Sequence, residues 1–190
     1  SYLRTHPLTF ERIADIQNRT REMPYRQVPD SIDFLLIRAK LRALQGKSYD
    51  AVAQFKVRLE EKRYNNEAVE RYGYIQALLR DKKAHQANAE LNRLYQLLHD
   101  DPSASVLRAH VLGKPIRIEY KQIIAGAMME TLSADVLLAN GKTAEALKAY
   151  QRGVKIYPRH RALMHGYARA LIQDKQPQAA LDFINKQLQF

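Results

Sequence analysis

The sequence contains no cysteine, and it has only seven glycines and seven prolines among 190 residues. The lack of cysteine excludes a disulfide-bonded scaffold, a thiol nucleophile and a thiolate metal site. No apolar run approaches the ~20 residues that a membrane-spanning helix needs. With 46% hydrophobic and 27% charged residues, the chain has the composition of an ordinary globular protein and is long enough to bury a core.

Acidic residues are scarce relative to basic ones: 20 Asp and Glu stand against 31 Lys and Arg, a formal net charge of +11. Such a charge suggests an anionic partner, either nucleic acid or a membrane surface. The excess is concentrated near the C-terminus, where the basic patch consists of Arg152, Lys155, Arg159, Arg161 and Lys175. No aromatic residues alternate with these cations and no recognition-helix pattern accompanies them. Nucleic acid is therefore a disfavoured partner, while peripheral membrane contact stays open.

Sequence signatures of catalysis are missing as well. The chain has no His-Glu-x-x-His metal motif, no Gly-x-x-x-x-Gly-Lys phosphate loop, no Gly-x-Gly-x-x-Gly and no Gly-x-Ser-x-Gly. His160 and His165 are five residues apart, whereas two ligands on one helix face need a spacing of four. We therefore expect no catalytic residue, metal ligand or cofactor site in this chain.

What the chain does contain is an internal repeat of 34 residues: Ala134 and Ala146 recur as Ala168 and Ala180. This period is typical of the tetratricopeptide repeat (TPR), a pair of antiparallel helices. The stretch from 137 to 158 resembles that repeat, with a glycine in the turn, a small residue where the helices cross, a ring between them and a closing proline. These residues are Gly141, Ala146, Tyr150 and Pro158.

Two degenerate repeats are predicted upstream, so the expected fold class is all-α: a TPR array of about four repeats in a right-handed superhelix. The repeats lie near 31–64, 66–101, 127–160 and 161–190 of a domain covering 30–190, with an irregular helical insertion at 102–126. Matching Ala39 to Gly73, again 34 residues apart, puts about two extra residues into the turn at 81–86. Residues 1–29 do not fit the repeat and are interpreted as an N-terminal helix and a linker, because prolines interrupt helices there.

Stacked helix pairs create a concave groove that receives peptides or proteins. In TPR proteins the fifth and ninth positions of each first helix point into it, which gives the groove residues Lys40, Glu70, Tyr74, Thr131, Asp135, His165 and Arg169. The alternative, that these are merely exposed helix faces, stays open. The asparagine set with which one subfamily clamps a terminal carboxylate is missing. At the C-terminal end we expect Phe183 and Phe190 to dock against another domain or a second copy, because no polar capping helix follows them.

The N-terminal segment carries a more specific resemblance. Residues 3–13 contain Thr-His-Pro and then Arg-Ile, similar to the end of a zinc metallopeptidase domain of the His-Glu-x-x-His class. Residues 25–31 and 34–41 resemble the start of the C-terminal repeat region of BepA-type bacterial peptidases. The resemblance covers the chain in outline, with its specific part within residues 1–45. It implies a non-catalytic C-terminal region whose zinc is held in an upstream domain, and it gives no catalytic or zinc-binding role to any residue here, His6 included.

The same resemblance implies a periplasmic location and a groove that faces the chain's own peptidase domain. It also implies contacts with outer-membrane β-barrel proteins or their assembly machinery. No signal peptide is visible, and because the sequence starts with Ser we expect a leader to have been removed. The first hypothesis is thus a module that recruits or positions substrate for an attached zinc peptidase. The alternatives are a free-standing TPR adaptor and a binder of anionic ligands through the basic patch.

Overall fold

The structure is a computed structural model that describes residues 9–21, 30–100 and 123–188. The chain divides into two compact units, Ser1–Asp30 and Ser31–Phe190, which are described separately. In the described residues all regular secondary structure is α-helical, which confirms the all-α fold class. The predicted linker at 22–29, most of the insertion at 102–126, and Phe190 lie outside the described residues.

The first unit contributes helix α1, which covers Thr9–Arg21. Its apolar side chains Phe10, Ile13 and Ile16 recur every three residues, and all three are exposed. An i,i+4 ion pair between Asp15 and Arg19, 2.9 Å apart, lies on the same helix and supports it weakly because both groups are in water.

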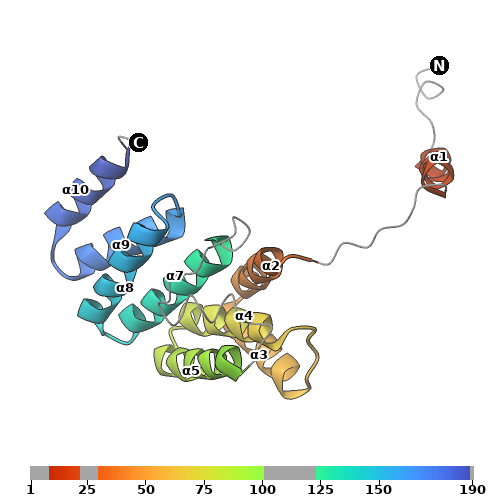
Figure 1. Cartoon of the computed structure of the whole chain (residues 1–190). Helices are drawn as coiled ribbons and strands as arrows, with labels where there is room; N and C mark the ends of the chain where they lie inside the picture. The colour runs from red at the N-terminus through yellow and green to blue at the C-terminus, as the bar shows by residue number, and fades with distance from the viewer. Residues whose placement is uncertain (1–8, 22–29, 101–122, 189–190) are drawn as a thin grey trace. The chain divides into compact units, whose positions relative to one another are not determined.

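The second unit is a series of antiparallel helix pairs (Figure 1). Its helices are α2 (Ile32–Leu44), α3 (Ser48–Glu60), α4 (Glu67–Arg80), α5 (Ala84–Asp100), α7 (Ile123–Ala139), α8 (Thr143–Ile156), α9 (Arg161–Gln173) and α10 (Pro177–Leu188). The helices form the pairs α2–α3, α4–α5, α7–α8 and α9–α10, and each of the first three pairs packs against the pair that follows it. Among the described helices, none is long and apolar enough to cross a bilayer.

All four pairs are closed by a three-residue turn whose middle residue has a left-handed backbone. These residues are Gly46 (φ 58°), Lys82 (φ 59°), Gly141 (φ 76°) and Lys175 (φ 60°). The prediction of two extra residues in the turn at 81–86 is therefore wrong. The extra residues lie between pairs instead, because six residues separate α3 from α4 whereas four separate α8 from α9. This difference shifts the register of α4 by two residues.

Helix α7 lies between two hydrophobic clusters, and its apolar residues are spread around the helix, as expected for a helix buried from several directions. Met129, Leu132 and Val136 pack into the cluster formed by α2, α3, α4 and α5. Ala127 and Ala134 pack instead into the cluster formed by α8 and α9. Helix α7 therefore joins the first two helix pairs to the last two, as its central place in Figure 1 shows.

The gap between successive pairs is filled in two ways. At two interfaces an aromatic ring sits over a glycine: a Cβ on Gly73 would lie 2.5 Å from Phe55 Cζ, and one on Gly166 would lie 2.8 Å from Tyr150 Cζ. Phe55 and Tyr150 each follow the left-handed residue of their turn by nine positions, and Gly73 and Gly166 precede theirs by nine.

At the interface between α5 and α7 the same two positions hold Leu91 and Leu132 instead, both buried in one cluster. At each of these interfaces, either an aromatic ring faces a glycine or one aliphatic side chain faces a second aliphatic side chain. Both combinations fill the space between successive helix pairs.

Candidate protein-binding groove

One depression of about 380 Å³ is lined mainly by the first helices of successive pairs. Gln76, Asp135 and Arg169 occupy equivalent places in it, each six residues before the left-handed residue of its own turn. We call this depression the first-helix groove. Its lining residues are Leu44, Gln76, Leu79, Arg80, Asp135, Leu138, Ala139, Arg169 and Gln173.

A three-residue polar network holds one side of this groove in place. Asp135 Oδ1 accepts hydrogen bonds from the Tyr150 hydroxyl at 2.6 Å and from Arg169 Nη2 at 2.6 Å. Burial raises the pKa of Tyr150, and the adjacent Asp135 carboxylate raises it further, so the hydroxyl stays a proton donor at neutral pH. The network connects α7, α8 and α9, and it means that the Arg169 charge is already balanced within the chain.

Arg80 has a structural role at the other side of the groove. Its Nη1 donates to the carbonyl oxygens of Ala43 and Gln45 at 3.1 Å, and its Nη2 donates to the Gly46 carbonyl at 2.6 Å. These carbonyls lie at the C-terminal end of α2, where helix geometry leaves acceptors unsatisfied and the dipole favours a cation. The groove therefore offers leucine side chains and two primary amides, with its charged groups occupied.

The structure brings together two of the predicted groove residues, Asp135 and Arg169. Thr131 is buried, and its hydroxyl donates to the Ala127 carbonyl at 2.7 Å within its own helix. His165 is exposed and Lys40 is half-buried, and neither lines the first-helix groove.

Glu70 and Tyr74 also lie elsewhere, because the register of α4 differs by two residues from the sequence-based alignment. Glu70 is buried at 4% exposure, accepts from Arg58 Nε at 2.6 Å, and bonds both terminal nitrogens of Arg42 at 3.3 Å. It joins α2, α3 and α4 and is not a surface residue. The α4 residue at the position equivalent to Asp135 and Arg169 is Gln76, which sequence reasoning missed because the turn at Lys82 contains no glycine to mark it.

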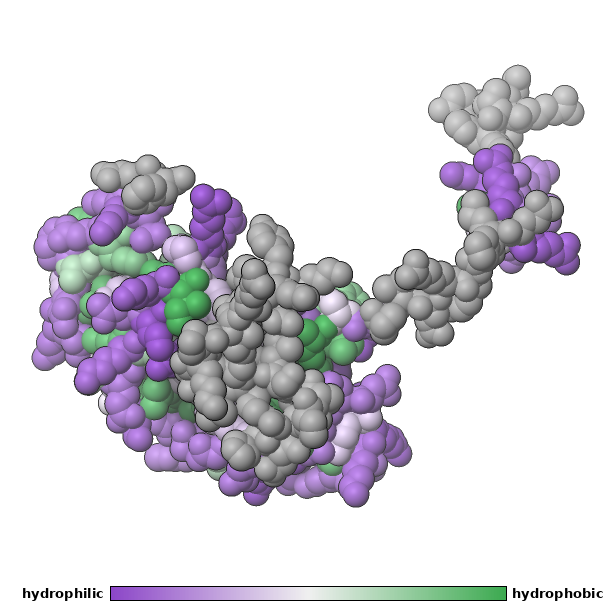
Figure 2. Space-filling view, in the orientation of Figure 1, coloured by the Kyte–Doolittle hydropathy of each residue, from purple (hydrophilic) through white to green (hydrophobic). Residues whose placement is uncertain are grey.

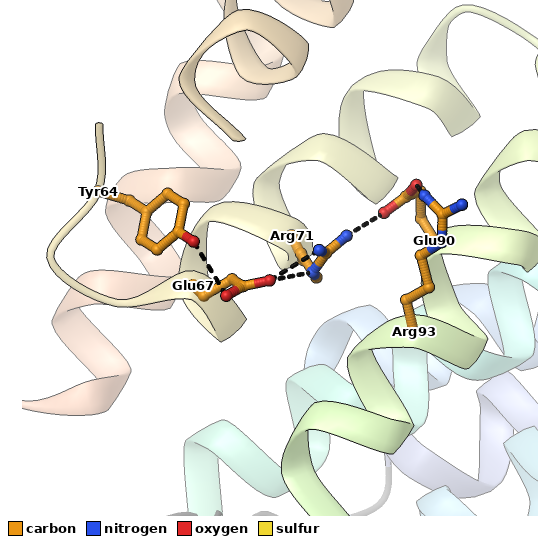
Figure 3. A network of polar contacts seen from close by, with 5 residues as sticks. All are labelled: Tyr64, Glu67, Arg71, Glu90 and Arg93. Atoms are coloured by element: carbon orange, nitrogen blue, oxygen red, sulfur yellow. Dashed lines mark hydrogen bonds and ion pairs between the residues drawn. The ribbon is translucent and has the colours of Figure 1, made fainter. Parts of the chain in front are cut away.

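Tyr74 lines a different depression of about 570 Å³ between α3, α4 and α5, together with Lys56 and Glu90. A chain of polar contacts crosses its edge, from Tyr64 through Glu67, Arg71 and Glu90 to Arg93 (Figure 3). Partial burial raises the pKa of Glu67, but hydrogen bonds from Arg71 and Tyr64 outweigh it and lower that pKa overall. Every charged group in this network has an oppositely charged partner. We therefore interpret the network as a structural link between helices and not as a binding site.

The basic patch is only partly available to a partner. Arg152 Nη2 lies 2.9 Å from Glu130 Oε2, and that carboxylate is nearly buried. Lys155, Arg159, Arg161 and Lys175 are exposed.

At the C-terminal end, the predicted docking residue Phe183 is partly buried and meets Tyr167 edge to face, with ring centres 4.9 Å apart. It therefore packs against its own chain, and Leu181 and Ile184 are large apolar residues of α10 that are exposed.

Comparison with known proteins agrees with this architecture. The family model described as tetratricopeptide repeat matches residues 137–189, which include the turn and second helix of the third pair and both helices of the fourth. No curated protein and no solved structure matches the chain. The same helix-pair unit, with its left-handed turn, occurs in α2–α3 and α4–α5. The chain thus carries a TPR array, a fold that serves protein–protein interaction.

Proposed function

We propose that this chain recruits or positions protein substrates for a zinc metallopeptidase domain upstream in the same polypeptide. The observation that carries the protein-binding part is the first-helix groove, where the first helices of all four helix pairs contribute to one depression. Gln76 and Gln173 can hydrogen-bond the backbone of an extended segment, while Leu79 and Leu138 offer apolar contact to its side chains. Recognition of charged groups contributes little to binding in this groove, because Asp135 and Arg169 neutralise each other.

The peptidase part of the proposal is supported by the resemblance of residues 1–45 to BepA-type enzymes. In this proposal the chain supplies no catalytic group and binds no cofactor, and zinc is held by the upstream domain. The complete protein acts in the periplasm, with outer-membrane β-barrel proteins or their assembly machinery as partners. The upstream gene sequence is the first check: a His-Glu-x-x-His motif supports an attached peptidase, and its absence favours a free-standing adaptor.

Photocrosslinking from the groove tests the partner. A photoreactive residue is placed at Gln76 or Gln173 in the complete protein in its cell, and at Gln54 of α3 as a control, since Gln54 is exposed and lies outside the groove. We expect unfolded outer-membrane β-barrel proteins or assembly components to be captured from the two groove positions. Equal capture from Gln54 would contradict the groove assignment.

One observation favours a second function, binding of an anionic membrane surface. Lys155, Arg159 and Arg161 are exposed and lie within five residues of Ile156 in the sequence, which is 45% exposed, and basic residues together with an exposed apolar side chain suit a lipid interface. Co-sedimentation with vesicles containing anionic lipid, repeated at increasing salt, measures this. Membrane binding is supported if the wild type binds the vesicles at low salt and the variant with all three cations changed to glutamine does not. It is excluded if the wild type does not bind at low salt.

A further inference from the structure

Helix α2 carries a row of four large apolar side chains on its surface. Phe34, Ile37, Leu41 and Leu44 are 49%, 42%, 57% and 51% exposed. Their spacing of three, four and three residues puts them on one helix face. Figure 2 shows hydrophobic atoms at the surface where Figure 1 places α2. We call these four residues the α2 stripe.

The other first helices show what this face is for. Counted back from the left-handed residue of each turn, the stripe occupies positions −12, −9, −5 and −2. In α7 the first three of these positions are Met129, Leu132 and Val136, which pack into the cluster of the preceding helices. In α9 they are Leu163, Gly166 and Ala170, all buried, and a Cβ on Gly166 would meet Tyr150 of the preceding helix.

Helix α4 gives the same result with polar contacts. Its residues at those positions are Glu70, Gly73, Ala77 and Arg80. Glu70 bonds Arg42 and Arg58, Gly73 lies under Phe55, and Arg80 bonds carbonyls at the end of α2. This face of a first helix therefore binds the helix pair that precedes it. In α2 the corresponding face is apolar, and none of the described residues covers it fully.

The residue at position −9 specifies the shape of the occupant. Where this position is glycine, the facing helix inserts an aromatic ring, and where it is Leu132, the facing helix has Leu91. The α2 stripe has Ile37 here, whose side chain fills the space a ring would need. The facing helix must therefore present an aliphatic ridge, as α5 does toward α7.

The charges around the stripe add a second requirement. Arg38 lies on one flank of the stripe, with its guanidinium carbon 5.4 Å from the centre of the Phe34 ring. Lys40 lies on the other flank by helix geometry, and Arg80 is anchored at the C-terminal end of the stripe. Asp33 lies near the N-terminal end of the stripe. The flanks are basic on balance, so acidic residues on the partner helix are favoured and a second copy of this chain, which carries +11, is disfavoured.

We propose that the α2 stripe is a docking surface for an amphipathic helix that has an aliphatic ridge and acidic flanks. The surface is separate from the first-helix groove except for Leu44, which belongs to both. The inference holds whichever ligand the groove takes.

Binding of synthetic helical peptides to the complete chain tests this inference. The probe has leucines at the spacing of the stripe and glutamates on both flanks, and a second peptide has lysines on the flanks. We expect the acidic peptide to bind more tightly than the basic one. Leu41→Asp should lower the affinity of the chain for the acidic peptide by about tenfold or more. Val57→Asp on α3, also an exposed apolar position at 45% exposure, should change its affinity less than about twofold.

A third peptide, with phenylalanine at the central ridge position, tests the role of Ile37. It should bind the wild type more weakly than the leucine peptide, and Ile37→Ala should reverse this order by opening space for the ring. Circular dichroism and the unfolding midpoint check that each variant keeps its fold. The inference is overturned if Leu41→Asp leaves binding unchanged, if the basic peptide binds as well as the acidic one, or if sedimentation shows a dimer that Leu41→Asp dissociates.

Discussion

At the scale of single residues, the spacing between helix pairs depends on which two side chains meet there. Phe55 is 1% exposed, and its ring occupies the space above Gly73. Tyr150 does the same above Gly166 and also donates its hydroxyl to Asp135. Two glycines in helix interiors, each of which lowers helix propensity by about 1 kcal/mol, are thus explained by the rings that face them.

Gly73→Ala should destabilise the protein although alanine is the better helix former. The added Cβ would lie 2.5 Å from Phe55 Cζ and 3.2 Å from Ala39 Cβ, so the ring must move. We expect a loss of about 1–3 kcal/mol in the free energy of unfolding, measured by urea denaturation. Phe55→Leu in the same chain should recover part of this loss, because Leu91 is accepted opposite Leu132. A Gly73→Ala variant more stable than the wild type would contradict this packing.

Glu70 is a second residue whose contribution to stability can be measured. Glu70→Gln keeps the shape but leaves Arg42 and Arg58 facing each other without a carboxylate. Because these arginines are 33% and 40% exposed and can turn toward water, we expect a loss of about 1–3 kcal/mol, less than for a fully buried pair. The matched control is Glu60→Gln: Glu60 pairs with Lys56 at 3.7 Å in solvent and should contribute under about 0.5 kcal/mol. Equal effects of the two substitutions would show that Glu70 is not a link between helices.

At the scale of the helix, the start of α9 depends on a histidine cap. The Nδ1 atom of His160 accepts a hydrogen bond from the Leu163 N–H at 3.4 Å. Burial lowers the pKa of His160, and the positive charge of Lys40 lowers it further. Protonation at Nδ1 also removes the acceptor, so the cap is present only in the neutral form.

The stability of α9 should therefore depend on pH in a defined direction. The unfolded chain takes up the His160 proton near pH 6.5, whereas the folded chain does so at a lower pH. The free energy of unfolding thus falls as the pH drops from the unfolded-state pKa to the folded-state pKa. His160→Asn keeps a side-chain cap without titrating, so the slope between about pH 7 and pH 5.5 should be smaller than in the wild type.

A second substitution separates the cap from the titration. His160→Ala removes the cap and should cost about 1 kcal/mol at neutral pH, unlike His160→Asn. Thermal or urea unfolding at a series of pH values provides both readouts. If His160→Asn has the slope of the wild type, then other groups cause the pH dependence.

Helices and turns differ in how far the sequence could predict them. The last two pairs were predicted because Gly141, Ala146 and Tyr150 appear at characteristic spacings, and a TPR array is confirmed as the fold. The register of α4 was not predictable by the same logic, because Lys82 adopts the left-handed backbone that glycine usually marks. The two-residue difference between the α3–α4 and α8–α9 connections has no local sequence signal, and it displaced the predicted groove position from Gln76 to Tyr74.

At the scale of the whole repeat unit, helix α7 and the groove depend on each other. One face of α7 belongs to the core of the first two pairs and another to the core of the last two. The same helix presents Asp135 and Leu138 to the groove, between Gln76 of α4 and Arg169 of α9. The residues that line the groove are therefore determined by how the helix pairs pack. For this reason, a two-residue error in the predicted register of α4 changes which residues are predicted to line it.

The central claim is that the first-helix groove binds extended protein segments, and a titration with matched glutamine variants tests it most directly. An unfolded outer-membrane β-barrel protein is titrated into the complete chain, into the double variant Gln76→Arg and Gln173→Arg, and into the double variant Gln54→Arg and Gln151→Arg. The last two glutamines are exposed outside the groove, so both variants add the same charge. We expect the groove variant to lose about tenfold or more in affinity, roughly 1.4 kcal/mol, and the control variant to stay within about twofold of the wild type. Equal affinities for the two variants would contradict the claim.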